Sequence, residues 1–449
     1  MEEFKMNKEN NETESENKNT EEQSEVEYVP SAIVGNKLYE IVQIGGDTKF
    51  VYLDEQGNAT YTERIKTNNR EYAPLNGEEI MAGVVIIPTG VMEYQSVEEL
   101  ITSLKDYFKK YVDLSADMYE LAAYYVLLTY AYDQLHQIVY LRFMGDIGCG
   151  KSRAQDVIGR VCYRPVCTQG GTSSAALFRM TQKLKGTVLI DEGDYRVSDE
   201  KADIAKYLNC GFQKGKSVIK CSTSNPDNLQ YFDSYCPKII CTRREFEDKA
   251  TESRCITEVM QETQRKDIPA ILPKCFYQES EQLRNKLLFW RLRNWQLVNP
   301  DDALDFNIPE IEPRVKQAYS SLAIVIKPFP EAYSRFLTFV KAYSQRIIDD
   351  RASSTDGQII GALFELWELQ KEVTSQEISS RLENAVSAQK VGSTLKSLGL
   401  TTKPVKIKGK TMRIVLKDDA VLEKLRRRYG YNSYESYGCK EGNPEPCKA

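Results

Sequence analysis

Histidine is almost missing from this chain, which has 449 residues and a single histidine, His136. That scarcity argues against a zinc site built from histidines and against a Ser-His catalytic pair. The 11 cysteines include no Cys-x-x-Cys pair. Several of them, such as Cys167, Cys241 and Cys255, fall inside apolar strand patterns. We therefore expect reduced thiols in the core of a cytoplasmic protein.

The chain also lacks a hydrophobic run of the roughly 18 residues that would predict a membrane span. The closest run, Leu121 to Tyr132, is shorter and lies between Glu120 and Asp133. The N-terminus has no basic segment followed by an apolar one, the pattern that is typical of a secretory signal. We expect a globular protein with no membrane partner.

Acidic residues are absent from 387–417, which holds eight Lys or Arg, although the whole chain has a net charge of −5. Residues 1–29 hold ten Glu and only three Lys. Such segregation of charge indicates an anionic partner for the basic segment more clearly than the total does. The acidic segment has little apolar content, which predicts a disordered tail at 1–27.

The octapeptide at 145–152 carries the strongest motif. Its residues Gly145, Asp146, Ile147, Gly148, Cys149, Gly150, Lys151 and Ser152 match the phosphate-binding pattern G-x-x-x-x-G-K-[ST]. An apolar run at 138–144 predicts a strand before it, and 154–161 predicts a helix after it. In such a loop, backbone N–H groups and the helix N-terminus surround a phosphate. Lys151 is expected to reach the β- and γ-phosphates, and Ser152 to hold Mg²⁺.

A strand expected at 187–191 ends in Asp191, and Glu192 follows directly. In a parallel sheet both acids would lie at the edge where the phosphate-binding loop opens. Asp191 would then belong to the Mg²⁺ shell, and Glu192 would orient or deprotonate the attacking water. The alternative is a strand end with incidental acids. Small-molecule kinases and GTPases rarely need an Asp-Glu tandem at this place, and no guanine-specific Asn-Lys-x-Asp is present. ATP hydrolysis is therefore favoured over phosphoryl transfer to a metabolite.

With these motifs the chain resembles AAA+ ATPases. Thr242, at the end of an apolar strand at 237–242, resembles the first sensor, although many members have Asn there. Arg254 resembles the arginine finger that completes a neighbouring subunit's site, its alternative being a salt bridge to Glu252 or a neighbouring acid. Arg314 resembles the second sensor, its alternative being an ordinary arginine at a helix start. The resemblance implies ATP and Mg²⁺ as cofactors and a hexameric ring of identical subunits.

Within AAA+ proteins the chain resembles replicative helicases of plasmids, phages and other mobile elements, and more distantly MCM-like helicases. The pattern at 214–221 and 229–233, with a turn between, predicts a β-hairpin before the first sensor. In those helicases a hairpin at this place grips DNA. Lys216 and Lys220 would then contact phosphate, and Tyr231 or Phe232 would stack on bases. A surface hairpin with solvated lysines is the alternative.

The segment 354–428 predicts three helices and a β-hairpin, which resembles a winged helix-turn-helix. A capping box, Thr374-x-x-Glu377, starts the second helix, and Ser387 caps the third. The third helix is expected in the major groove of DNA and the basic hairpin on the backbone. The expected DNA contacts are Gln389, Lys390, Ser393, Lys396, Lys406, Lys408, Lys410 and Arg413. A winged helix used for protein contacts is the alternative.

The expected fold class is therefore α/β: a P-loop AAA+ core with a parallel sheet and a helical lid, after a small β-meander domain and before a winged helix. The expected boundaries are 1–27 (tail), 28–95 (β-rich domain), 96–300 (ATPase core with preceding helices), 301–353 (lid), 354–428 (winged helix) and 429–449 (flexible tail). Lys151, Glu192, Thr242 and Arg254 are the expected catalytic residues, and Arg314 binds nucleotide. The expected function is a DNA-dependent ATPase and helicase. The alternatives are an ATP-switched initiator, loader or regulator, and a P-loop kinase.

Overall fold

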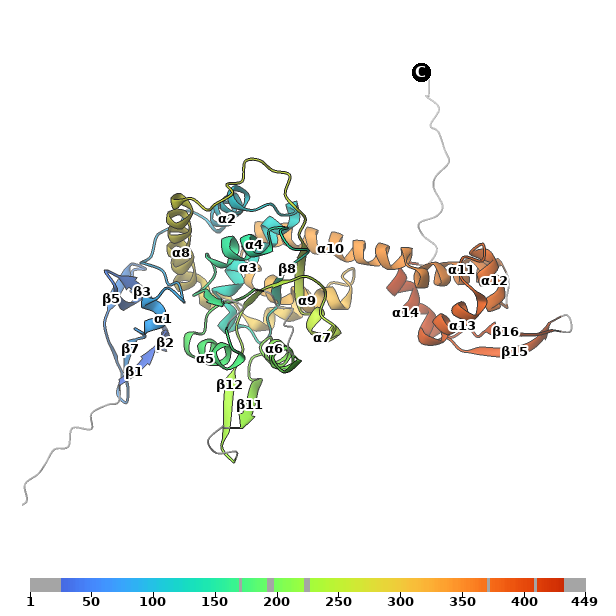
Figure 1. Ribbon diagram of the computed structural model, residues 1–449, viewed down its shortest axis with the longest axis horizontal. Helices are drawn as coiled ribbons and strands as arrows, with labels where there is room; N and C mark the ends of the chain where they lie inside the picture. Colours follow the sequence, from blue (N-terminus) through green and yellow to red (C-terminus); the bar gives the residue numbers. More distant parts are fainter. Residues whose placement is uncertain are drawn as a thin grey trace, which may run out of the picture.

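The computed structural model describes residues 26–168, 172–191, 198–221, 227–369, 372–407 and 410–431; for 198–202, 407, 410 and 411 it describes the backbone alone. Figure 1 shows a small β-rich part, a large central part, and a C-terminal part at the end of a long helix. Within these ranges no helix combines the length and the apolarity that crossing a membrane requires.

The N-terminal part consists of two small sheets. One sheet is antiparallel, in the order β2-β3-β4-β5, and follows the chain as a meander. In the other, β7 pairs in parallel with β1 and antiparallel with β6. The elements are β1 (Val26–Val29), β2 (Ser31–Val34), β3 (Lys37–Ile44), β4 (Asp47–Leu53), β5 (Ala59–Thr62), β6 (Ile65–Lys66), β7 (Glu71–Pro74) and the short helix α1 (Glu78–Met81). Because β1 pairs with β7 from Val26 onward, the chain is ordered two residues earlier than the expected tail boundary.

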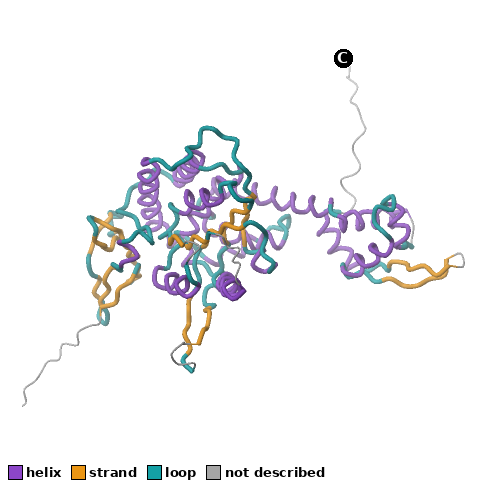
Figure 2. Tube along the Cα trace, in the orientation of Figure 1, coloured by secondary structure: helices purple, strands orange, loops and turns teal. Residues whose placement is uncertain are grey.

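The central part is built on a sheet of five parallel strands, in the order β14-β8-β13-β10-β9. Figure 2 shows strands in orange among the purple helices of this part. The strands are β8 (Tyr140–Met144), β9 (Val166–Thr168), β10 (Val188–Ile190), β13 (Lys238–Thr242) and β14 (Cys255–Val259). The bounds of β8, β10 and β13 lie within two residues of the strands expected at 138–144, 187–191 and 237–242. The expectation of a parallel α/β sheet is thus confirmed.

Helices surround this sheet. They are α2 (Val97–Tyr111), α3 (Ala116–Thr129), α4 (Lys151–Gly159), α5 (Ser174–Leu184), α6 (Ser198–Cys210), α7 (Lys249–Glu252) and α8 (Lys274–Asn294), with 3-10 turns η1 (Tyr132–Gln134), η2 (Trp295–Leu297) and η3 (Pro300–Phe306). Nearly every residue of α3 is buried, so it forms the centre of the hydrophobic core. The helix ends at Thr129, before the apolar run does, and the chain enters η1, where Asp133 pairs with Arg291.

The cysteines of the described residues have free thiols. Cys241 is buried within β13, as expected. Cys167 is exposed, contrary to the core position that its apolar neighbours indicate. The reason is that β9, which carries Cys167, is the edge strand of the sheet.

Two helices lead from the core to the C-terminal part. They are α9 (Pro313–Ile326) and α10 (Pro330–Ser353), and Pro328 and Pro330 divide what otherwise reads as one helical pattern. The first half of α10 packs on α9 through Phe336 and Val340. Its second half has few buried side chains and extends to the C-terminal part (Figure 1).

The C-terminal part has its own hydrophobic core. It contains α11 (Thr355–Leu369), α12 (Ser375–Arg381), α13 (Ala388–Ser397), the antiparallel pair β15 (Thr402–Ile407) and β16 (Lys410–Val415), and α14 (Asp419–Tyr429). The capping box at Thr374 and the cap at Ser387 are confirmed. The helix α14 was not expected from the sequence, although Asp418 caps it and Leu422 and Leu425 pack into the core.

Candidate nucleotide site and nucleic-acid surfaces

The phosphate-binding loop connects β8 to α4, and its glycines are required by its backbone. Gly148 and Gly150 have φ angles of 85° and 93°, which favour glycine. Gly145 has no room for a side chain, because a Cβ there would lie 2.6 Å from the carbonyl oxygen of Met260. No side chain caps the N-terminus of α4. Its first amide groups are thus directed at the loop without a side-chain acceptor.

Lys151 extends back over this loop. Its Nζ donates hydrogen bonds to the carbonyl oxygens of Gly145 and Asp146 at 2.7 and 2.6 Å. Cys149 is buried beneath the loop, with its Sγ 3.8 Å from the same Nζ. Ile147 is 79% exposed. The two hydrogen bonds therefore hold the Lys151 ammonium against the backbone of the loop.

Ser152 and Asp191 meet across the carboxyl edge of the sheet. Ser152 is in the first turn of α4, and Asp191 directly follows β10. The Ser152 hydroxyl lies 3.3 and 3.2 Å from the two carboxylate oxygens of Asp191. A hydroxyl and a carboxylate are oxygen ligands of the kind that Mg²⁺ prefers. Glu192, the expected base, lies outside the described residues.

Thr242 ends β13, the strand that separates β8 from β10 in the sheet. Its carbonyl oxygen accepts a hydrogen bond of 3.2 Å from the N–H of Gly145, at the start of the loop. The side chain is 1% exposed, and its Oγ1 finds no hydrogen-bond partner among the described residues. A buried, unpaired hydroxyl beside a phosphate-binding loop is suited to an oxygen ligand.

Gln155 is a residue of the site that the sequence motifs do not indicate. It lies on α4, is 4% exposed, and donates from Nε2 to the carbonyl oxygens of Ile190 at 2.8 Å and Ile239 at 2.9 Å. Those oxygens belong to β10 and β13, the strands that lead to Asp191 and Thr242. One amide group thus fixes α4 to both strands. The signal in the sequence was a glutamine within the helix predicted at 154–161.

Arg254 lies at the opposite edge of the sheet from the phosphate-binding loop. It precedes β14, and its carbonyl oxygen accepts from the N–H of Tyr140, the first residue of β8. Its guanidinium bonds to Asn209 Oδ1 and stands 3.9 Å from the centre of the Phe212 ring. The alternative ion pair with Glu252 is not formed, because Arg142 of β8 holds that carboxylate through two hydrogen bonds.

Arg314 is exposed in the first turn of α9. Among the described residues, no hydrogen bond or ion pair joins it to the phosphate-binding loop. Its helix packs on α3 and α10. The single chain therefore brings together Lys151, Ser152, Asp191 and Thr242, and leaves Arg254 and Arg314 apart from them.

The expected hairpin is present as β11 (Ser217–Cys221) and β12 (Leu229–Asp233) and projects from the core (Figure 1). Lys220 is paired with Asp203 of α6 at 2.7 Å, and Phe232 packs on Phe178 of α5. Tyr231 is 59% exposed, and Lys216 is also exposed. Of the four expected contact residues, Lys220 and Phe232 thus contact neighbouring helices, whereas Tyr231 and Lys216 are exposed, with the Lys216 Nζ 5.8 Å from the centre of the Phe212 ring.

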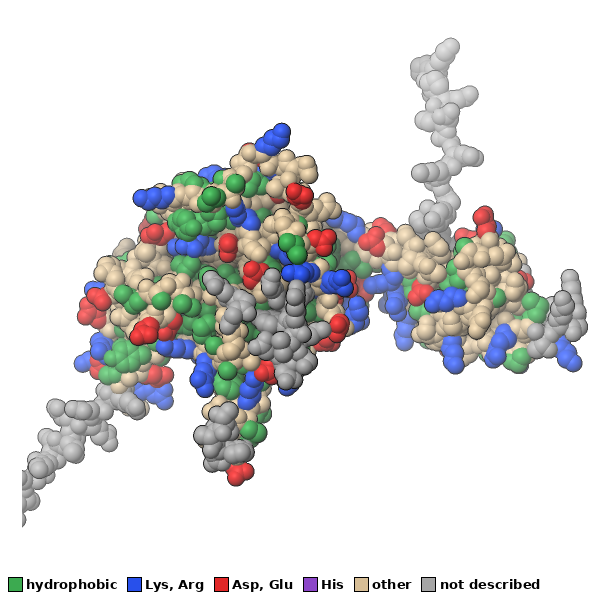
Figure 3. All heavy atoms as spheres, in the orientation of Figure 1, with side chains coloured by type: hydrophobic (Ala, Val, Ile, Leu, Met, Phe, Trp, Pro, Cys, Tyr) green, Lys and Arg blue, Asp and Glu red, His purple; other side chains and the backbone are tan. Residues whose placement is uncertain are grey.

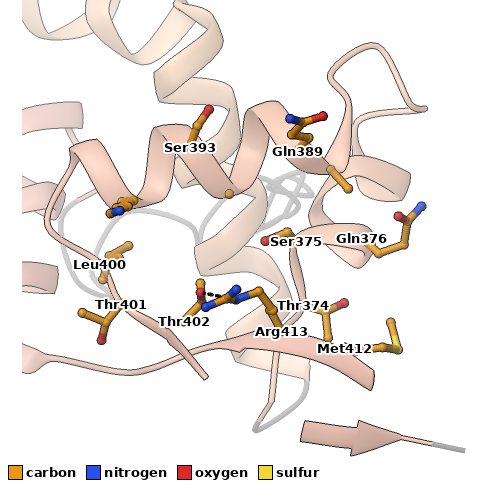
Figure 4. Close-up of a pocket in the computed structure, with 13 residues that line it drawn as sticks. Thr374, Ser375, Gln376, Gln389, Ser393, Leu400, Thr401, Thr402, Met412 and Arg413 are labelled. Atoms are coloured by element: carbon orange, nitrogen blue, oxygen red, sulfur yellow. Dashed lines mark hydrogen bonds between the residues drawn. The ribbon is translucent and has the colours of Figure 1, made fainter. Parts of the chain in front are cut away.

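A groove of about 760 Å³ lies on the C-terminal part, between α12, α13 and β16 (Figure 4). Its walls include the expected contacts Gln389, Ser393, Lys396 and Arg413. Blue side chains follow the lower edge of this part in Figure 3. Lys390 and Lys406 are exposed but do not line the groove. Lys408 lies outside the described residues, as does the side chain of Lys410.

A parallel sheet with this loop at its carboxyl edge defines a P-loop-like α/β core. No family model matches the chain, and no curated protein sequence matches it. Solved structures that match include the apo C-terminal region of NrS-1 in its A form, which is 14% identical at a TM-score of 0.38 over 84% of this chain and 96% of that one.

Two further solved structures are similar at a comparable distance. The active helicase SCCmec type IV Cch is 11% identical, with a TM-score of 0.40 over 89% of this chain and 81% of that one. A full-length MCM homolog from Methanopyrus kandleri is 10% identical, with a TM-score of 0.33 over 71% and 76%. These likenesses are distant, and the proposals below rest on the residues of this chain.

Proposed function

We propose that the protein hydrolyses ATP with Mg²⁺ and couples this reaction to DNA, as a helicase of the AAA+ kind. The contact between Ser152 and Asp191 is the observation that carries the proposal. It brings a hydroxyl and a carboxylate together beside Lys151, so that one Mg²⁺ ion would have ligands from both the loop and the sheet.

Each residue has a distinct task in this proposal. The 145–152 backbone and Lys151 bind the phosphates, and Ser152 and Asp191 hold the metal ion. The unpaired hydroxyl of Thr242 is available to the terminal phosphate or to the attacking water. Glu192 follows Asp191 in the sequence and is proposed as the base that activates this water.

Arg254 fits the proposal only as a residue that acts on a neighbouring copy. It lies at the edge of the sheet where the strands begin, one strand length from its own phosphate-binding loop, and a five-residue strand spans roughly 17 Å. A ring of six identical subunits would bring it to the next subunit's nucleotide. Arg314 remains a candidate for nucleotide binding from the lid.

DNA is the proposed partner for two surfaces. We interpret the three helices α11 to α13 and the β15–β16 hairpin as a winged helix, and the groove on this part has a lining that carries Lys396 and Arg413 and no acid. Absence of acids beside lysine and arginine favours contact with phosphates. The hairpin β11–β12 offers Tyr231 for base stacking.

The test is ATP hydrolysis measured with and without single-stranded DNA, together with strand displacement. Lys151→Ala is expected to abolish hydrolysis, whereas Glu192→Gln should keep ATP binding and lose turnover. ATP-dependent unwinding by the unmodified protein supports a motor. Hydrolysis that neither variant changes would contradict the proposed site.

The groove favours one second candidate, an ATP-switched initiator, loader or regulator that binds a DNA site through its C-terminal part. This candidate predicts a footprint on a specific DNA sequence without strand displacement. Replacing Gln389 and Ser393 by alanine would then relax the sequence preference, since these side chains face the groove.

A further inference from the structure

A small polar pocket lies between α9 and the edge of the sheet where the strands begin. Its volume is about 90 Å³. Ser253 and Arg254 line the pocket where the chain passes from α7 to β14, and α9 contributes four further lining residues. The lining residues are Gln137, Ile138, Val139, Phe212, Ser253, Arg254, Gln317, Ala318, Ser320 and Ser321.

The lining is rich in hydrogen-bond donors and contains no acid. Arg254 supplies its charge, and among the described residues no carboxylate pairs with it. Its bond to Asn209 uses one of the guanidinium N–H groups. The nearest acid in the sequence, Glu252, is held by Arg142. Arg254 therefore has no ion-pair partner among the described residues, and Asp248 is joined to it only through their shared neighbour Asn209.

Ser321 provides the second, independent observation. Its side chain is 3% exposed, it lines the pocket from α9, and its hydroxyl has no hydrogen-bond partner among the described residues. Ser320, the next residue, is different, because its hydroxyl already donates to the carbonyl oxygen of Gln317. A buried hydroxyl without a partner is uncommon in proteins and points to an absent acceptor.

We infer that this pocket binds a phosphate-sized oxyanion, with Arg254 as its cation and Ser321 as a buried donor. A guanidinium offers several N–H groups in a fixed plane to the oxygens of such an ion. The bound ion would connect α9 to the sheet, since Ser321 and Arg254 belong to these two elements. It comes either from free inorganic phosphate or from the terminal phosphate of a nucleotide on a neighbouring copy; only the second source rests on the proposed function.

The experiment uses inorganic phosphate and the full-length chain, with phosphate binding followed by calorimetry and by thermal stability at constant ionic strength. Lys151→Ala serves as the background, because it removes phosphate binding by the loop. In that background we expect one remaining site that Arg254→Gln removes. Ser321→Ala should weaken it by about five- to tenfold, the loss of one hydrogen bond to an ion. Ser320→Ala is the matched control and should leave affinity unchanged.

The same variants provide the control for folding. Without phosphate, the Ser321→Ala variant should have a Tm no lower than that of the chain with Ser321, since the hydroxyl has no partner to lose. Its weaker phosphate binding should appear only as a smaller rise in Tm when phosphate is added. If the Lys151→Ala chain binds no phosphate, but Ser321→Ala and Arg254→Gln both slow ATP hydrolysis in assembled protein, the neighbour's nucleotide is the source. If Ser321→Ala and Ser320→Ala give the same phosphate affinity and the same rate of ATP hydrolysis, the inference is wrong. If Lys151→Ala leaves phosphate binding unchanged while Ser321→Ala weakens it and Arg254→Gln removes it, the loop proposal, and not this pocket, is at fault.

Discussion

Glu40 and Arg291 are 251 residues apart in the sequence and form an ion pair that is buried on both sides. Arg291 Nε donates to Glu40 Oε1 at 2.7 Å, and each side chain is 1% exposed. Arg164 donates to the other carboxylate oxygen at 2.5 Å. Arg291 also pairs with Asp133. One acid of β3 thus joins the N-terminal part to α8 and to the segment after α4.

Glu40→Ala is expected to lower the free energy of unfolding by about 3–5 kcal/mol, because it leaves Arg164 buried without a carboxylate and Arg291 with Asp133 alone. Urea denaturation followed by fluorescence measures this. Glu63→Ala is the control, since Glu63 is 74% exposed and pairs with Lys49 at the surface. Its expected effect is at most about 1 kcal/mol. Equal losses in the two variants would contradict the bridging role of Glu40.

Gln155→Leu keeps the volume of the side chain in α4 but removes the amide that bonds to β10 and β13. Since Asp191 directly follows Ile190, the proposed metal ligands should lose their alignment. We expect kcat to fall by about 10–100-fold, the usual effect of an outer-shell partner of a metal site. The concentration of Mg²⁺ that gives half-maximal rate should rise as well. A loss of stability with an unchanged Mg²⁺ requirement would make Gln155 a packing residue only.

Asp248 makes the segment before Arg254 sensitive to acid. Hydrogen bonds from Asn209, and then from Thr251, hold the pKa of the Asp248 carboxyl below its usual value. A lowered folded pKa means that the stability is present above the unfolded pKa, near 4, and is lost as pH falls through the folded value. Hydrogen exchange at the amides of Ala250 and Thr251, which Asp248 caps, should lose protection below about pH 4. Asp248→Asn also caps a helix but does not titrate, so its protection should change less.

Tyr231 and Phe232 are neighbours on β12 that face opposite sides of the hairpin. If the hairpin contacts single-stranded DNA, Tyr231→Ala should weaken binding by roughly 1–3 kcal/mol, the value of one stacked base. Its effect on thermal stability should be small, because Tyr231 is exposed. Phe232→Ala should lower the melting temperature, because its ring lies 5.6 Å from that of Phe178. DNA affinity, measured by fluorescence anisotropy, that is insensitive to Tyr231→Ala would remove the hairpin from the DNA path.

The central sheet could be predicted because its strands are short apolar runs that end at charges or glycines. The parallel arrangement then placed Ser152 and Asp191 at one edge, where the structure has them in contact. The caps at Thr374 and Ser387 were equally readable, since each depends on residues within one helical turn.

Contacts between distant segments could not be predicted in this way. The choice of Arg142 over Arg254 as the partner of Glu252 depends on which strand lies beside β14. The pairing of Lys220 with Asp203 depends on how the hairpin leans on α6. The helix α14 was missed because its many charged residues, three of them consecutive arginines from Arg426, obscure an apolar stripe of only Leu422, Leu425 and Tyr429.

The helix α10 has a geometric consequence for the whole chain. Its 24 residues give a length of about 36 Å, from an N-terminal end beside α9 to a C-terminal end that contacts α11 and α14. If a helix of that length stays straight, tilting its N-terminal end by about 5° would displace its C-terminal end by about 3 Å. Small rotations of α9 and α10 against the sheet would therefore reach the C-terminal part as a swing nearly as wide as one residue step along a strand.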